Sequence, residues 1–360
     1  MKPSLLLFAG LLSLACAPAE GDNVPNPIPA VFAPSARPAP PRGIPTMDPE
    51  TWARLLKLRE SNDVLPWLQP IRQLSGNSTS RGGVEFPPNS VAGDQKPGGV
   101  NLDFSMLVED FAVAGVSIDT NAGRAFIFTL NRNFDLTEYD GQRPQPKPEL
   151  IIDRLAFGTP TAGWQKYRGG LMLRQGVQHT VEVKSRDAND ATVTSTLHGT
   201  YRGWRLVDKG SLPVQQKTWE EWAAEGVTFE RHPLKVTIPG LPASPSTEAV
   251  SADLTFPAEW LVTGLYLDVA DQSGLGQTRN MLFRVNPPQA AAIQGDWVSA
   301  PTVSVNTFRE TAWRFPIPYH VSKDTLWRLE FKKNLDDGQG AGSATVVMVE
   351  GFRLVRPGQQ

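Results

Sequence analysis

The sequence has very little cysteine and no strong excess of charge of either sign. Cys16 is the one cysteine among 360 residues, so no internal disulfide and no thiolate cluster for structural zinc can form. The net charge of -2 gives no general attraction to nucleic acid or anionic lipid. The apolar run from Leu5 to Ala15 is too short to span a bilayer comfortably. Stability must come from apolar burial, for which ten Trp and sixteen Phe are present.

The sequence also lacks the motifs that mark common catalytic sites. Its four histidines form no His-Glu-x-x-His pair, and there is no Gly-x-Ser-x-Gly nucleophile turn. No glycine-rich segment has the form of a phosphate-binding loop. We therefore expect a protein that is not an enzyme and that carries no cofactor.

An internal repeat is present instead, and it predicts the architecture. The segment 203–207 (GWRLV) returns as 351–355 (GFRLV), and 181–184 (VEVK) returns as 329–332 (LEFK), both 148 positions later. Further matches pair Phe128 with Phe283 and Gly115 with Gly264. A repeat of this length indicates one domain duplicated in tandem.

Each copy has the pattern of an antiparallel β-sandwich. Short segments rich in β-branched and aromatic residues alternate with Gly, Asn, Asp and Pro turns, and helical periodicity is absent between them. We expect an all-β protein with tandem jelly-roll or β-sandwich domains, an N-terminal arm and short helices. The expected division is a signal-like segment 1–19, a Pro-rich arm 20–47, a short helix and loop 48–99, a first sandwich 100–210, a helical connector 211–233 and a second sandwich 234–356.

The N-terminus favours export. A basic start, an apolar centre and small residues are typical of a secretory signal peptide. The segment 12–16 (LSLAC) resembles a bacterial lipobox, which makes Cys16 a candidate for lipidation, although Ser13 occupies the usual Leu position. An uncleaved arm that packs on a membrane or a partner is the alternative.

Two acidic loops and three larger side chains are the remaining candidates. The loops at matched positions could hold Ca²⁺, but Asp, Asn and Gly also suit ordinary turns. Their oxygen-bearing residues are Asp187, Asn189, Asp190, Asp336 and Asp337. Candidate interface residues are Trp52 on the predicted helix and the matched pair Arg205 and Arg353, which could instead form surface ion pairs with Glu182 and Glu330. Four tryptophans could stack on sugars, but core packing is the simpler interpretation: Trp164, Trp297, Trp313 and Trp327.

The tandem β-sandwiches of residues 100–356 and the N-terminal arm resemble the double jelly-roll capsid proteins of tailless, membrane-containing phages. The resemblance is architectural and rests on no diagnostic motif. It implies a virion shell protein that forms trimers, contacts neighbouring shell proteins, and meets a membrane or another subunit through its arm, without specific nucleic-acid binding. The alternative is an exported lipoprotein on the outer membrane or cell surface, which presents two β-sandwiches to a glycan or a protein.

Overall fold

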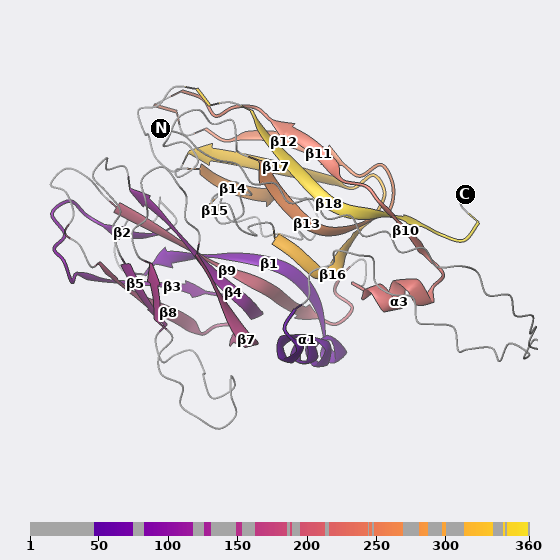
Figure 1. Ribbon diagram of the computed structural model, residues 1–360, viewed down its shortest axis with the longest axis horizontal. Helices are drawn as coiled ribbons and strands as arrows, with labels where there is room; N and C mark the ends of the chain where they lie inside the picture. The colour runs from indigo at the N-terminus through magenta and orange to yellow at the C-terminus, as the bar shows by residue number, and fades with distance from the viewer. Residues whose placement is uncertain are drawn as a thin grey trace, which may run out of the picture. The chain divides into compact units, whose positions relative to one another are not determined.

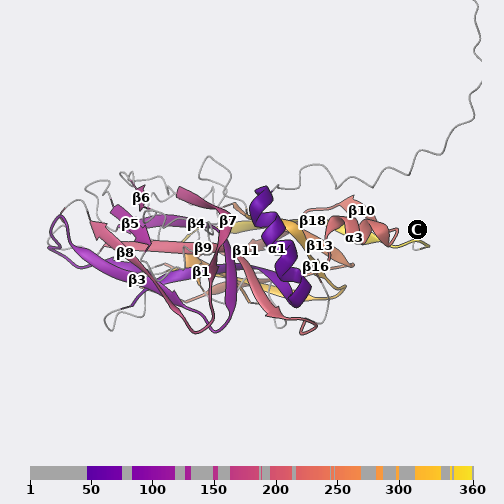
Figure 2. The same ribbon diagram turned by 90° about the horizontal axis from the view of Figure 1, so that it is seen from below.

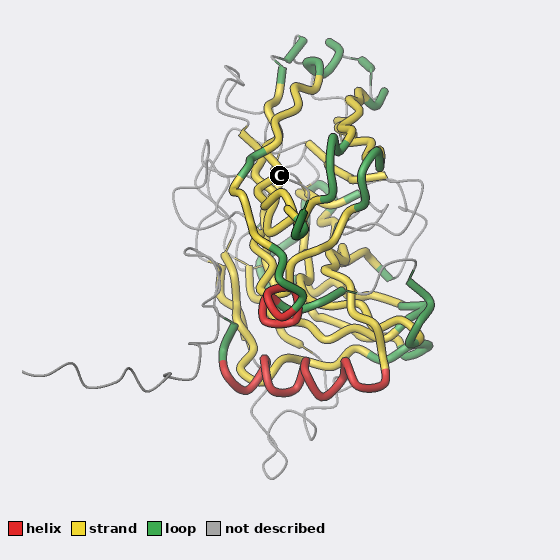
Figure 3. Tube along the Cα trace, turned by 90° about the vertical axis from the view of Figure 1, so that its right-hand side faces the viewer, coloured by secondary structure: helices red, strands yellow, loops and turns green. Residues whose placement is uncertain are grey.

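The computed structural model describes most of the chain after residue 46. The described residues are 47–74, 83–117, 126–130, 149–152, 163–185, 188, 195–212, 216–243, 245–246, 248–268, 281–286, 297–299, 313–333, 341–342 and 344–358. Most of them lie in strands, as Figure 3 shows. In this described part, no helix is long and apolar enough to cross a membrane.

The first copy forms two sheets of a β-sandwich (Figure 1). Its elements are α1 (Pro49–Ser61), β1 (Asn62–Gln73), β2 (Val84–Phe86), β3 (Gln95–Asn101), β4 (Ser105–Ser117), β5 (Phe126–Leu130), β6 (Glu149–Ile152), β7 (Gly163–Leu173), β8 (Gln178–Ser185) and β9 (Ser195–Asp208). One sheet has the order β1-β9-β4-β7, and the other has the order β3-β8-β5-β6. A short pairing of β1 with β3 joins them, and β2 pairs with β9.

The second copy repeats this arrangement. Its elements are α3 (Trp219–Ala224), β10 (Thr228–Arg231), β11 (Leu234–Ile238), β12 (Val250–Thr255), β13 (Trp260–Asp268), β14 (Met281–Asn286), β15 (Val298–Ser299), β16 (Trp313–Val321), β17 (Leu326–Lys333) and β18 (Thr345–Val355). One sheet places β10 and β11 beside β18, followed by β13 and β16, and the other has the order β12-β17-β14-β15. Two sheets with these crossings form a jelly roll, so the predicted all-β fold is confirmed. We call the copies roll 1 and roll 2.

The strand registers confirm the duplication. Phe128 lies opposite Val183 in roll 1, and the matching residues Phe283 and Phe331 lie opposite each other in roll 2. The strand register is irregular at the same point of β4 and β13, after Val108 and after Val262. A shared irregularity of this kind is a feature of the repeated unit rather than a local accident.

The same registers correct one sequence match. Directly after the irregularity, Asp110 pairs with Arg202 and Gly264 pairs with Glu350. Asp110 therefore corresponds to Gly264, and the sequence-based match of Gly115 with Gly264 is wrong. The error arose because alternating apolar residues in a strand align almost equally well after a shift.

The boundaries of the repeat are also corrected. Residues 48–99 are not merely a helix and a loop, because β1, β2 and β3 lie there. β1 pairs with β9 in roll 1, and β10 and β11 pair with β18 in roll 2. Leu65 lies opposite Arg205, and Glu230 lies opposite the matched Arg353. A helix precedes this strand in both copies, so each repeat begins at its helix, and the 211–233 connector belongs largely to roll 2.

β1 is absent from the expected helix and loop of residues 48–99, and it contains Pro66 and Pro70, a residue type that usually ends regular structure. Over Asn62–Ile71 it pairs with β9 on one side, and no described strand lies on its other side. A proline tolerates such an edge because its missing N–H is not needed there. β9 also contains a residue that often ends a strand, yet it runs unbroken through Gly199.

Both helices begin as the sequence predicts. Asp48 caps α1, and its side chain accepts hydrogen bonds from the amides of Glu50 and Thr51. Thr218 caps α3 in a capping box with Glu221. α1 contacts β7 (Figure 2), whereas the buried Trp219 and Trp222 of α3 pack in the cluster that contains Leu261, Phe352 and Leu354.

Candidate functional site: the junction of the two rolls

The two rolls share one hydrophobic cluster. Leu107 and Trp204 of roll 1 belong to the same buried cluster as Ile317 and Trp327 of roll 2, with Leu55 of α1. β1 and β9 of roll 1 contact β15 of roll 2, and β1 also contacts β16. This apolar contact holds the rolls together, because buried apolar area contributes roughly 25 cal/mol per Å².

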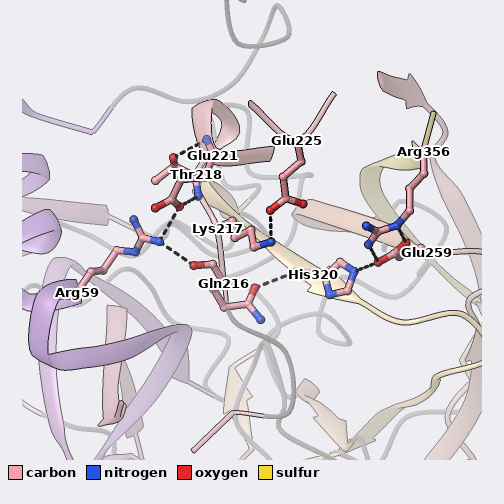
Figure 4. Close-up of polar contacts among 9 residues, drawn as sticks. All are labelled: Arg59, Gln216, Lys217, Thr218, Glu221, Glu225, Glu259, His320 and Arg356. Carbon is pink, nitrogen blue, oxygen red and sulfur yellow. Dashed lines mark hydrogen bonds and ion pairs between the residues drawn. The ribbon is translucent and has the colours of Figure 1, made fainter. Parts of the chain in front are cut away.

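A polar network lies beside this cluster, and we call it the junction (Figure 4). It joins residues of α1, of the segment before α3 and of roll 2. Its members are Arg59, Gln216, Lys217, Thr218, Glu221, Glu225, Glu259, His320 and Arg356. The segment that connects the rolls therefore contacts both of them.

The α1 side of the junction depends on Arg59. Its Nη2 donates to the backbone oxygen of Gln216 at 2.7 Å and to Glu221 Oε2 at 2.9 Å. Burial alone would raise the pKa of Glu221, but the hydrogen bonds from the Thr218 amide and from Arg59 lower it on balance. Glu221 is thus kept ionised, and it links the N-terminus of α3 to α1.

The roll 2 side of the junction is built on His320. Its backbone N–H donates to Gln216 Oε1 at 2.8 Å, and its Nε2 lies 2.7 Å from Glu259 Oε1. Arg356 donates to both carboxylate oxygens of Glu259, at 2.6 and 3.0 Å. These hydrogen bonds from Arg356 lower the pKa of Glu259, and the hydrogen bond with His320 acts in the same direction.

His320 is buried, and its surroundings on balance favour the neutral form of its imidazole. Burial lowers its pKa, and the Glu259 carboxylate opposes this only in part. The imidazole lies 5.1 Å from the Trp222 ring, and Lys217 lies 4.6 Å from the same indole. Lys217 also pairs with Glu225. Because the Nδ1 atom of His320 is buried without a hydrogen-bond partner, a second proton there would find no acceptor.

The junction has the chemistry of a structural clamp. In the described part of the chain, no three His, Cys, Asp or Glu side chains gather as a metal site would require. His320 and Glu259 form a pair that could in principle exchange a proton, but Arg356 occupies both oxygens of the carboxylate. The network is therefore suited to hold helix, linker and sheet in one arrangement.

The predicted interface residues have other surroundings. Arg205 lies 4.7 Å from the ring of Trp67 and 4.4 Å from that of Phe104, at the edge of the roll 1 core. Burial lowers its pKa, opposed by Asp103. Trp52 is half-buried and packs against the shared cluster.

The alternative interpretation, in which each arginine pairs with its matched glutamate, is wrong. Glu182 lies on β8, which β3 and β1 separate from the β9 strand of Arg205. In roll 2, Arg353 lies 3.9 Å from Glu230, while Glu330 pairs with Arg284. The pairing failed because β8 and β17 belong to the opposite sheet from β9 and β18.

Several candidates lie outside the described residues. These are Cys16 and all five Ca²⁺ candidates, Asp187, Asn189, Asp190, Asp336 and Asp337. Of the four tryptophans, Trp327 is buried in the shared cluster, as core packing predicts. Trp297 is half-buried, directly before β15. Nothing is concluded for the side chains of Trp164 and Trp313.

Sequence reasoning missed Gln216 and did not connect it to His320. The two are far apart in sequence, and their contact depends on how the linker passes the edge of β16. The one available signal was the capping box at Thr218, which fixes where α3 begins and so where Gln216 lies.

Comparisons with known proteins give distant structural neighbours. No protein-family model matches the chain, and no curated protein matches it in sequence. The major capsid protein P2 from bacteriophage PM2 is 11% identical, covers 82% of this chain and 99% of its own, and has a TM-score of 0.20. The mavirus major capsid protein is 10% identical, with 94% and 93% covered and a TM-score of 0.21. A fucolectin from striped bass (Morone saxatilis) serum is 9% identical, with 83% and 98% covered and a TM-score of 0.19. At such TM-scores, the fold follows from strand order and register alone.

Proposed function

We propose that this chain is a non-catalytic structural subunit of a virion shell, a capsid-type protein that assembles through its two jelly rolls. The observation that supports this most is the way in which the rolls meet. They have equivalent strands, yet different surfaces touch: β1 and β9 of roll 1 contact β15 of roll 2, and β1 also contacts β16. A contact between unlike surfaces of like units is head-to-tail, and it can be repeated.

The repeat leaves the complementary surfaces unused within one chain. In roll 2, β10 with β11 and β18 correspond to β1 and β9. In roll 1, β6 and β7 correspond to β15 and β16. Met348 on β18 corresponds to Thr200 on β9, and it is 37% exposed whereas Thr200 is fully buried. An apolar side chain that is open in roll 2, at a position buried in roll 1, supports a role in contact with a second copy.

Closing this contact around a ring gives the expected trimer of chains, with six rolls in the ring. The shell location, the neighbouring shell proteins and a membrane contact of the N-terminal segment belong to the same proposal. The near-neutral net charge supports a role without specific nucleic-acid binding.

The test is the oligomeric state of the full chain by size-exclusion chromatography with light scattering. We expect a trimer, and Met348→Asp should shift it toward monomer because burying an unpaired carboxylate is costly. Val91→Asp is the matched control, since Val91 is 60% exposed in a loop of roll 1. A strictly monomeric wild type, or a trimer indifferent to Met348→Asp, contradicts the proposal.

The lipoprotein alternative has its own decisive outcome. Intact mass and N-terminal sequencing of the native protein would then find a chain that starts at a diacylglyceryl-modified Cys16. That result, with a monomer in detergent, supports an exported protein that presents two rolls for glycan or protein binding.

A further inference from the structure

An aromatic and cationic cluster lies on the β15-β14-β17 sheet of roll 2. Trp297 stands directly before β15, Arg284 lies on β14, and Lys332 lies on β17 (strands labelled in Figure 1). The guanidinium of Arg284 is 4.4 Å from the centre of the indole, and the ammonium of Lys332 is 4.6 Å from it. Glu330 accepts a hydrogen bond from Nε of Arg284 at 2.5 Å.

The positive charge of this cluster is only partly neutralised. Glu330 serves Arg284, and Lys332 forms no ion pair with any described carboxylate. Burial lowers the pKa of Lys332, and the neighbouring charge of Arg284 lowers it further. Two cations held close together beside one carboxylate would gain from a bound anion. The terminal nitrogens of Arg284 form no hydrogen bond with a described residue, so they remain available as a donor fork.

Roll 1 shows that the fold itself does not require this cluster. In the shared register, Arg284 corresponds to Thr129, because these residues lie opposite Glu330 and Glu182. Trp297 aligns with Glu149, which lies opposite Thr129. Only the lysine is kept, as Lys184. The jelly roll therefore folds without the indole and the guanidinium, and their presence in roll 2 needs a different reason.

We propose that Trp297, Arg284 and Lys332 form a binding site for an anionic saccharide. Its carboxylate or sulfate would accept from Arg284 and Lys332, and an apolar sugar face would pack on the half-buried indole. Glu330, besides orienting Arg284, would accept a hydrogen bond from a sugar hydroxyl. The site suits a ligand with one acidic group next to a pyranose ring, because Arg284, Lys332 and Glu330 together leave a net charge of about +1.

The test is calorimetric titration of the full chain at low salt with four probes: glucuronic acid, glucose 6-sulfate, glucose and inorganic sulfate. We expect millimolar binding of one or both acidic sugars, and binding at least about tenfold weaker for glucose and for sulfate, since a hydrogen bond to a charged group is worth about that factor or more. Equal binding of glucose, or sulfate bound as tightly as the sugars, overturns the proposal, and so does no binding at all.

The duplication supplies matched variants. Lys332→Gln and Trp297→Ala should each weaken binding of the acidic sugar at least about tenfold, whereas Lys184→Gln at the equivalent position of roll 1 should leave it unchanged. Lys332→Gln keeps the strand polar, so it retains the fold if Trp297→Ala does not, and unchanged thermal unfolding checks this. Equal effects of Lys332→Gln and Lys184→Gln contradict the assignment. A failure here does not touch the oligomeric proposal, which uses other surfaces.

Discussion

The hydrogen bond from the His320 amide to Gln216 predicts a local and measurable loss when it is removed. β16 is the edge strand of its sheet, and the Gln216 side chain accepts an N–H for which no described strand lies alongside. Both residues are buried, with 5% of Gln216 and 6% of His320 exposed, so water does not readily replace the lost acceptor. Gln216→Met keeps the length of the side chain, and the backbone oxygen that accepts from Arg59 is unchanged.

The expected cost is that of one unsatisfied buried N–H group, about 1–3 kcal/mol. Hydrogen–deuterium exchange of the His320 amide should therefore become about 5- to 150-fold faster in Gln216→Met. Amides of β13 that pair within the sheet should keep their protection, because the substitution leaves the ladder intact. Gln178→Met, at an exposed position on β8, is the control. Unchanged protection of the His320 amide would refute the view that Gln216 fastens the linker to roll 2.

Three further predictions follow from buried groups. Because burial lowers the pKa of His320, the folded state binds fewer protons than the unfolded state. The unfolding free energy should therefore fall as the pH decreases below about 6.5. His320→Gln should flatten this part of the pH dependence when it is measured by urea unfolding. Asp110→Ala removes a fully buried carboxylate to which Nε of Arg202, whose side chain is 11% exposed, donates at 2.8 Å; it should cost about 3–5 kcal/mol in the same assay, with a cost below about 1 kcal/mol arguing against it. Gly203→Ala and Gly351→Ala should each cost about 1–3 kcal/mol, since the added Cβ would lie 2.1 Å from the Leu107 oxygen and 2.5 Å from the Leu261 oxygen; a thermal shift in only one of the two would contradict their equivalence.

Most of roll 2 could be predicted from the sequence, and part of roll 1 could not. In roll 2, segments rich in β-branched and aromatic residues between turn residues coincide with β12, β13, β14, β16, β17 and β18. β1 was missed because proline at an unpaired edge looks the same in sequence as proline in a loop. In the sequence, Gly199 suggests a turn, whereas in β9 it allows Ile71 and Phe111 to approach the backbone closely.

The site was less predictable than the fold. The junction joins five separate stretches of sequence, and no pattern around Gln216 predicts that it accepts a hydrogen bond. Trp297 was noticed, but its two cationic neighbours come from different strands and become visible only once Arg284 and Lys332 are placed in register. The sequence shows which residue types are present, but it does not show which of them become neighbours on adjacent strands.

The helix that opens each repeat has a consequence for how such a chain arose. A one-roll ancestor that began with this helix would have carried both mating surfaces on every molecule, so identical copies could associate before any fusion occurred. In the proposed assembly, joining two such rolls in one chain would make one contact in every two intramolecular. Once the two halves were covalently paired, each was free to specialise, and the uneven distribution of aromatic and charged side chains between them is the outcome that such freedom permits.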